Sequence, residues 1–315
     1  MEYRKLIKFG NSSHIVSLPN YWLKKNNLKK GALIYFEENG NGELVLNPDV
    51  KKQHIKSECV IEDNGDLKDL HRRLVSNYIA GYDIIKINLK NNKNLTTLKN
   101  YLGSLIAFEL IDQSGNQVVT KDLLDIHEIS IEKIIRRIDV LIRSMMADTK
   151  FSYTTDNFEE IYARDEEINR LTFLGHRILK KCIEAPKLAE KIDLDNNTII
   201  EKWMLISNLE KIGDEVKRIS RYLTRLKSKK LKIKEILDVY SEVSSNYIKG
   251  VDSYYKKNLK TAYEIASTKH AIIDKCNKLL EKNENPYLFN ILDRTKALQT
   301  YIRDIARSVY QQRVI

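Results

Sequence analysis

The chain has little cysteine and no cysteine motif. Its three cysteines, Cys59, Cys182 and Cys276, are scattered over 315 residues, and none belongs to a Cys-x-x-Cys pair. An odd number of isolated cysteines fits neither a disulfide framework nor a zinc site. We therefore expect buried free thiols, which excludes the small domains that depend on disulfides or structural zinc.

Long hydrophobic runs are also missing. No apolar stretch approaches the ~20 residues that a membrane-spanning helix needs. The first residues, Met-Glu-Tyr-Arg-Lys, lack the apolar segment of a signal peptide. We expect no membrane insertion and a cytoplasmic location.

The sequence motifs of several large enzyme classes are absent as well. It contains no Walker A lysine loop, no dinucleotide-binding glycine fingerprint and no nucleophile elbow. A carboxylate-bridged metal oxidase in a helical bundle would use paired Glu-x-x-His motifs, which do not occur here either. We expect no enzymatic activity.

What the chain does have is an excess of positive charge. Lys and Arg number 54 against 43 Asp and Glu, which gives a formal net charge of +11. Such a charge suits a polyanionic partner, either nucleic acid or an anionic membrane surface. Charge alone does not choose between them.

The length and the changing sequence pattern predict a multidomain protein, since single domains cluster near ~100–150 residues. Residues 1–50 alternate like short strands around turn residues, with strands expected at 5–9, 14–18, 32–36 and 43–46 and a short helix at 20–25. Residues 51–126 predict an α+β connector, with strands at 54–61, 83–89, 108–112 and 117–120 and helices at 66–80 and 95–106.

The remainder, residues 127–315, reads as an all-α domain. Apolar residues at helical spacing predict six amphipathic helices, at 130–149, 156–184, 197–227, 232–257, 258–283 and 285–313. Short polar links between helices of similar length favour antiparallel packing. Weak internal similarity between residues 208–219 and 298–305 favours two tandem three-helix bundles, 127–229 and 230–315.

The N-terminal pattern is that of a known DNA-binding scaffold. A basic strand leads into a Gly-Asn-Ser-Ser turn at residues 10–13, followed by Leu-Pro at 18–19, a short helix, Leu-Lys-Lys-Gly at 28–31 and a hairpin. This order resembles the SpoVT–AbrB family. The resemblance implies that two chains interleave their hairpins into one small swapped-hairpin β-barrel, giving a homodimer that binds double-stranded DNA. Fewer than 50 residues with four short strands can scarcely bury a core alone, which also favours pairing.

Within that scaffold we expect eight polar residues to contact DNA: Arg4, Lys5, Lys8, Asn11, Ser12, Ser13, Lys24 and Lys25. Cations would meet phosphates, and the loop residues can hydrogen-bond to phosphates or base edges. For any single lysine the alternative is a solvated surface charge.

The helical part carries a second resemblance. Residues 209–214, Leu-Glu-Lys-Ile-Gly-Asp, resemble the Glu-Arg-Ile-Gly-Asp signature of PhoU, a phosphate-uptake regulator built from two three-helix bundles. The whole arrangement resembles archaeal proteins that fuse an AbrB-like domain to PhoU. The resemblance implies a DNA-binding transcriptional regulator of phosphate uptake and homeostasis. The alternative is a signalling adaptor that docks on a phosphate transporter ATPase or a sensor protein, with the AbrB-like part serving dimerisation.

An acidic helical face accompanies the signature. Glu210 and Asp214 are four residues apart and so share one side of their helix. Asp165, Glu166 and Asn169 can face them across an antiparallel contact, at positions where PhoU proteins hold metal ions. The resemblance therefore implies one divalent or ferric ion at this cluster. Asn169 departs from the family pattern, because a neutral amide is a weaker ligand than the usual aspartate.

Two interpretations of this face remain open. Besides a metal site, it is equally explained as a solvated acidic stripe that forms ion pairs with Lys211, Lys217 and Arg218 at helical spacings. Gly213, inside the same helix, predicts close helix packing, since a helical glycine costs roughly 1 kcal/mol relative to alanine.

In the second bundle the corresponding positions are altered. Lys296 and Thr300 fall where Glu210 and Asp214 lie, and His270 and Asp274 fall near the positions of Asp165 and Asn169. A lysine places positive charge where a cation would bind. We expect no metal site there.

Overall fold

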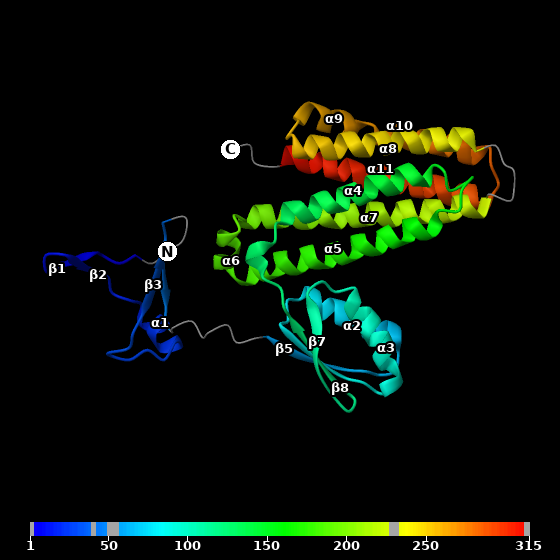
Figure 1. The fold of residues 1–315 in the computed structure, drawn as a ribbon. Coiled ribbons are helices and arrows are strands. Elements are labelled where there is room, and N and C mark those ends of the chain that lie inside the picture. Colours follow the sequence, from blue (N-terminus) through cyan, green and yellow to red (C-terminus); the bar gives the residue numbers. More distant parts are fainter. Residues whose placement is uncertain (1–2, 39–41, 49–56, 227–232, 312–315) are drawn as a thin grey trace. The chain divides into compact units, whose positions relative to one another are not determined.

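The computed structural model describes residues 3–38, 42–48, 57–226 and 233–311 (Figure 1). The chain divides into two compact units, Met1–Lys56 and Ser57–Ile315. The second unit contains the predicted connector from residue 57 onward and the predicted helical domain.

The N-terminal unit consists of two separate β-hairpins and one short helix. Its elements are β1 (Ile7–Phe9), β2 (Ser13–Ile15), α1 (Asn20–Lys25), β3 (Tyr35–Glu38) and β4 (Leu44–Asn47). β1 pairs with β2 and β3 with β4, both antiparallel. Gly10 takes a φ of +68° in the first turn, a conformation that glycine adopts without strain. The centre of the second predicted turn, residues 39–41, lies outside the described residues.

The strands of this unit do not close into a barrel among the described residues of one chain. They form two sheets of two strands each, with no pairing between the hairpins. The predicted strands appear in the predicted order, but they are shorter than expected, and residues 32–34 are not part of β3. The swapped barrel that the resemblance implies needs the hairpins of a second chain, so one chain by itself does not form it.

The second unit begins with a four-stranded mixed sheet and two helices. Its elements are β5 (Glu58–Glu62), α2 (Leu67–Ile79), β6 (Ile84–Asn88), η1 (Asn92–Asn94), α3 (Leu95–Gly103), β7 (Phe108–Ser114) and β8 (Gln117–Asp122). The strand order is β5-β6-β8-β7, with β5 and β6 parallel and the other pairs antiparallel. The predicted strand at 54–61 forms from Glu58 onward, and its residues 54–56 lie outside the described residues.

Side-chain periodicity explains how this sheet acquires its core. Leu70, Leu74 and Tyr78 recur at four-residue spacing on α2 and are buried, together with Ile85 of β6. The carboxylate of Asp66 accepts backbone N–H groups of the first turn and so fixes the start of α2. The α2 and α3 helices and one face of the sheet therefore form a small core of their own.

The described part of the helical domain contains two more α-helices than the six that the sequence predicts. Its elements are η2 (Ile126–Glu128), α4 (Ile131–Thr149), α5 (Phe158–Glu184), α6 (Pro186–Lys191), α7 (Asn196–Leu226), α8 (Lys234–Tyr255), α9 (Leu259–Ser267), α10 (Lys269–Glu281) and α11 (Pro286–Gln311). The predicted fifth helix is divided at Thr268 into α9 and α10, and the short α6 begins at Pro186. Proline suits this first helical position because its missing N–H would have no partner there.

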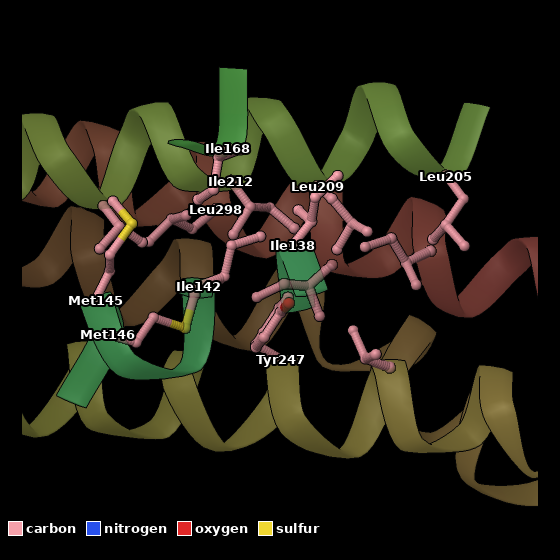
Figure 2. Close-up of a cluster of buried hydrophobic side chains, with 14 of the residues drawn as sticks. Ile138, Ile142, Met145, Met146, Ile168, Leu205, Leu209, Ile212, Tyr247 and Leu298 are labelled. Atoms are coloured by element: carbon pink, nitrogen blue, oxygen red, sulfur yellow. The ribbon is translucent and has the colours of Figure 1, made fainter. Parts of the chain in front are cut away.

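The two helical bundles share one core. The first bundle consists of α4, α5 and α7, and the second of α8, α9 with α10, and α11. The α7 helix packs against α4 and α5 of its own bundle and against α11 of the other. Figure 2 shows Ile142, Leu209, Tyr247 and Leu298, from four different helices, in a single hydrophobic cluster. The bundles are thus joined into one domain, and no described helix combines the length and apolarity that crossing a membrane requires.

A buried arginine joins the sheet to the helical domain. Arg177 on α5 is fully buried, and its guanidinium lies 2.5 Å from the Asp122 carboxylate at the end of β8. It donates hydrogen bonds to the backbone carbonyls of Tyr78 and Tyr82, and it lies over the Tyr78 ring. Lys181, one turn further along α5, also binds Asp122 at 2.7 Å. These contacts explain why the sheet and the helices belong to one compact unit.

Replacing Arg177 by methionine should therefore destabilise the second unit. The Arg177→Met change leaves buried carbonyl groups and part of the Asp122 charge without partners, a loss on the order of 3 kcal/mol. The matched control, Lys180→Met, removes a surface ion pair with Glu184, which typically contributes about 0–1 kcal/mol. Urea denaturation followed by circular dichroism measures both. Equal unfolding midpoints for the two variants would contradict this account.

Candidate functional site

The predicted acidic cluster forms where α5 and α7 pack against each other. Asp165 lies on α5 and Asp214 on α7, and Gly213 permits the close approach of the two helices. A Cβ atom at Gly213 would lie 3.0 Å from Ile168 Cδ1 of α5 and 3.9 Å from an Asp165 carboxylate oxygen. The prediction that this glycine marks close helix packing is confirmed.

A lysine occupies the space between the two carboxylates. Lys217 Nζ lies 2.6 Å from Asp165 Oδ2 and 2.7 Å from Asp214 Oδ1, so it bridges α5 and α7. Arg218 binds the other oxygen of Asp214 at 2.6 Å. The Asp165 side chain is only 3% exposed and that of Lys217 14%. The centre of the cluster is therefore a largely buried ion triad rather than a solvated stripe.

The other predicted ligands lie at the margin of this triad. The Asn169 amide is 3.5 Å from Asp165 Oδ2 on the same helix, while Glu166 is exposed and Glu210 is half-buried. Across the described part of the chain, no three His, Cys, Asp or Glu side chains are grouped so that they could hold a metal ion. The structure thus brings Asp165 and Asp214 together through Lys217 and leaves Glu166 apart.

The electrostatics of the cluster reflect its burial and its excess of carboxylates. Burial raises the pKa of Asp165, Lys217 lowers it, and Asp214 and Glu166 raise it further, so that the net shift is upward. Burial also raises the pKa of Glu210, and Asp214 and Asp165 add to that shift. For Lys217, burial lowers the pKa but the hydrogen bonds to its two carboxylates raise it more. The lysine is held in its charged form.

The ion pair between Lys217 and Asp214 could be expected from the sequence. It lies three residues after Asp214, so Glu210, Asp214 and Lys217 share one helical face. The contact between Lys217 and Asp214 agrees with the ion-pairing interpretation of this face. Its second contact, across to Asp165, depends on the spacing between α5 and α7, which the sequence does not reveal.

In the second bundle the altered positions form a different set of contacts. Lys296 lies 3.4 Å from Asp293 and 3.5 Å from Asn277 Oδ1. The Thr300 hydroxyl donates to the backbone carbonyl of Lys296 at 3.1 Å. His270 and Asp274 are exposed on α10.

The predicted DNA-contacting residues are all exposed and lie in the N-terminal unit. Arg4 and Lys5 precede β1, Lys8 lies on β1, Asn11 and Ser12 form the turn, Ser13 begins β2, and Lys24 and Lys25 end α1. Lys8 is paired in register with His14 across the β1–β2 hairpin. These positions leave the side chains accessible to a partner, and their role remains a prediction.

In the comparison with known proteins, one family model matches the first bundle. A model of the PhoU domain matches residues 135–223, a segment that begins in α4, contains α5 and α6 and ends in α7. Among solved structures, PhoU from Pseudomonas aeruginosa is similar over 57% of this chain and 93% of that chain, with 16% identity and a TM-score of 0.49. The phosphate transport system regulatory protein PhoU from Streptococcus pneumoniae is similar over 58% and 92%, with 17% identity and a TM-score of 0.46. No curated protein matches the chain.

The raised pKa of Glu210 predicts a pH-dependent effect of neutralising it. A carboxyl group whose pKa is higher in the folded state than its ordinary value of 4.5 stabilises the fold below that pH. This contribution is lost as the pH rises through the folded pKa. Glu210→Gln should therefore raise the unfolding midpoint at pH 7, and the gain should disappear as the pH falls toward 4.5.

Thermal unfolding across this pH range measures the effect. Glu264→Gln, an exposed position on α9, serves as the control and should leave the midpoint unchanged at both ends of the range. A lower midpoint for Glu210→Gln at pH 7 would show that the ionised Glu210 stabilises the fold.

Proposed function

We propose that this chain regulates phosphate uptake as a dimeric adaptor. Its helical domain docks on a phosphate transporter ATPase or a phosphate sensor, and its N-terminal unit joins two copies of the chain. The observation that carries this proposal is the PhoU-domain match at residues 135–223, which falls on the first bundle and includes its acidic cluster. The signature at residues 209–214 lies within the matched segment and agrees with the same assignment.

The exposed apolar surface of the N-terminal unit supports the dimer. No side chain that the structure describes in this unit, residues 3–36, 38 and 42–48, is buried. Large side chains on or beside its strands are left in solvent, among them Leu6, Phe9, Leu33 and Phe36, each more than 60% exposed. Burying one such side chain contributes about 1.5–3 kcal/mol. A second copy of the same unit offers a matching apolar surface, and the AbrB-like pattern supports pairing through the hairpins.

The adaptor proposal predicts both a dimer and a binding partner. By light scattering after gel filtration, the purified chain should have twice the mass of one chain. It should also bind the purified phosphate transporter ATPase of its own organism. The double change Phe9→Asp and Phe36→Asp should give monomers, because it places charge in the proposed interface. These monomers should still bind the ATPase. They should dissociate faster than the dimer from an ATPase-coated surface, because a dimer can bind through two linked sites at once.

The control variant is Phe289→Asp, which adds charge at a phenylalanine that is 53% exposed in the first turn of α11. It should remain dimeric. A monomeric wild-type chain would overturn the dimer, and a dimer that binds neither the ATPase nor a phosphate sensor kinase would overturn the adaptor.

A second candidate function, DNA-binding transcriptional regulation, is favoured by the charge of the N-terminal unit. Residues 1–56 contain ten Lys and Arg but only five Asp and Glu. The proposed DNA contacts, Arg4 to Lys25, lie on an exposed hairpin and helix. In a dimer these groups would be duplicated about a two-fold axis, an arrangement that fits two half-sites on DNA. The PhoU-domain match supports the adaptor function and gives no information on DNA binding.

This candidate predicts salt-dependent binding to DNA from a phosphate transporter promoter. Each lost phosphate contact should reduce the slope of log K against log salt by about 0.9, so Lys5→Ala with Lys8→Ala should flatten it. The control pair Lys278→Ala with Lys282→Ala removes two exposed charges at the end of α10 and should leave the slope unchanged. Equal slopes for both pairs would remove Lys5 and Lys8 from the proposed DNA surface.

A further inference from the structure

The contact between α5 and α7 contains a cation that belongs to the chain itself. The Lys217 ammonium group makes two short ion pairs, one to a carboxylate of each helix, and so occupies the position from which a bound ion would link them. Its side chain is mostly buried, and its Nζ also lies 5.9 Å from the centre of the Tyr162 ring. This geometry ties the two helices together electrostatically.

We propose that Lys217 is the resident counter-ion of this cluster and that the first bundle holds its carboxylates together without a metal ion. The proposal departs from what the PhoU resemblance implies. It is independent of the proposed function, because it concerns what links α5 to α7 and not what the domain binds.

The residues present do not fit a divalent or ferric ion. Lysine has three donors and no acceptor, so Lys217 cannot act as a ligand in its charged form. Both oxygens of Asp214 already bind cations, Lys217 and Arg218. Of the remaining candidates, Asn169 is a neutral amide, Glu166 points to solvent and Glu210 is half-buried. Water would have to supply most of the six or more oxygen ligands that Mg²⁺ and Ca²⁺ take.

A metal ion could enter only by displacing the ammonium group. A tethered group competes at an effective concentration in the millimolar range or above, whereas a metal ion must be drawn from solution. A displaced Lys217 would also lie close to the metal ion and repel it, because the lysine stem is anchored on α7 within the same contact. Both effects favour the lysine over the metal.

Asp165 explains why a cation is needed at all. Its carboxylate is 3% exposed and faces the neighbouring charges of Asp214 and Glu166. An isolated charge of this kind is costly to bury, and an ion pair with good geometry offsets much of that cost. Without Lys217 the first bundle would have to take up either a proton or a metal ion at this point.

The test compares the full-length wild-type chain with Lys217→Met and with Lys275→Met. The control removes a lysine that pairs with Glu242 on the surface of the second bundle. Each protein is stripped with EDTA and its unfolding midpoint is measured alone and with Mg²⁺, Mn²⁺ or ferric ion. Bound metal is then counted by mass spectrometry after dialysis.

We expect the wild-type and Lys275→Met proteins to retain almost no metal and to show the same midpoint with and without each ion. Lys217→Met should have a lower midpoint in EDTA. It should recover part of the loss when a metal ion is added, because the ion then binds the carboxylates that Lys217 no longer neutralises and stabilises the folded state. The double variant Asp165→Asn with Lys217→Met should recover without metal, since neither buried charge remains.

Two results would overturn the proposal. The first is wild-type protein that retains about one metal ion per chain, with the metal lost in Asp165→Asn. The second is a Lys217→Met midpoint equal to that of wild type in EDTA. If Lys217→Met does not fold, the comparison rests on Lys217→Arg, which keeps the positive charge. That variant must fold and remain indifferent to metal, and a metal-dependent midpoint would contradict the proposal.

Discussion

The second unit depends on a fully buried guanidinium group. Arg177 forms an ion pair with Asp122 and satisfies two backbone carbonyls at the end of α2, so it links β8, α2 and α5 at one point. A buried charge is favourable only when its geometry and hydrogen bonds are nearly complete. The sheet and the first bundle must therefore keep one mutual arrangement, because any displacement would leave the arginine without a partner.

The same principle operates between α5 and α7, with a different cation. Lys217 bridges two carboxylates there, and the close approach at Gly213 brings the helices near enough for it to do so. Thus α5 is tied on one side to the sheet and on another to α7, in both cases by ion pairs between side chains distant in sequence. Since α7 also packs on α11, the shared core connects these contacts to the second bundle.

The positions of the helices can be predicted from the sequence more accurately than the contacts between side chains. Apolar spacing places the ends of α4, α5 and α11 within a few residues, because burial of one face determines where each helix is stable. The break at Thr268 is not predicted, because the apolar spacing continues across it, and the short α6 lies in a segment expected to be a link between two helices. Arg177 and Asp122 are 55 residues apart, and nothing local marks them as a pair.

The candidate site shows the same limit. Glu210, Asp214 and Lys217 can be assigned to one helical face from their spacing, and the structure brings Asp214 and Lys217 into contact as that face requires. Whether Asp165 lies within reach is decided by the distance between two helices, which Gly213 and Ile168 set together. In the N-terminal unit, the order of the described strands follows from the turns, but these strands form two separate hairpins and no barrel within one chain.

The lack of buried side chains in the described N-terminal unit has a consequence for the cell. A segment that takes its folding free energy from association is folded only to the extent that it is associated. In the proposed dimer, the folded fraction of the N-terminal unit would rise with the amount of protein present, whereas the second unit has cores of its own. The abundance of the chain would itself set how much of it carries a structured N-terminal unit, and synthesis or degradation would act on that unit before any effector is bound.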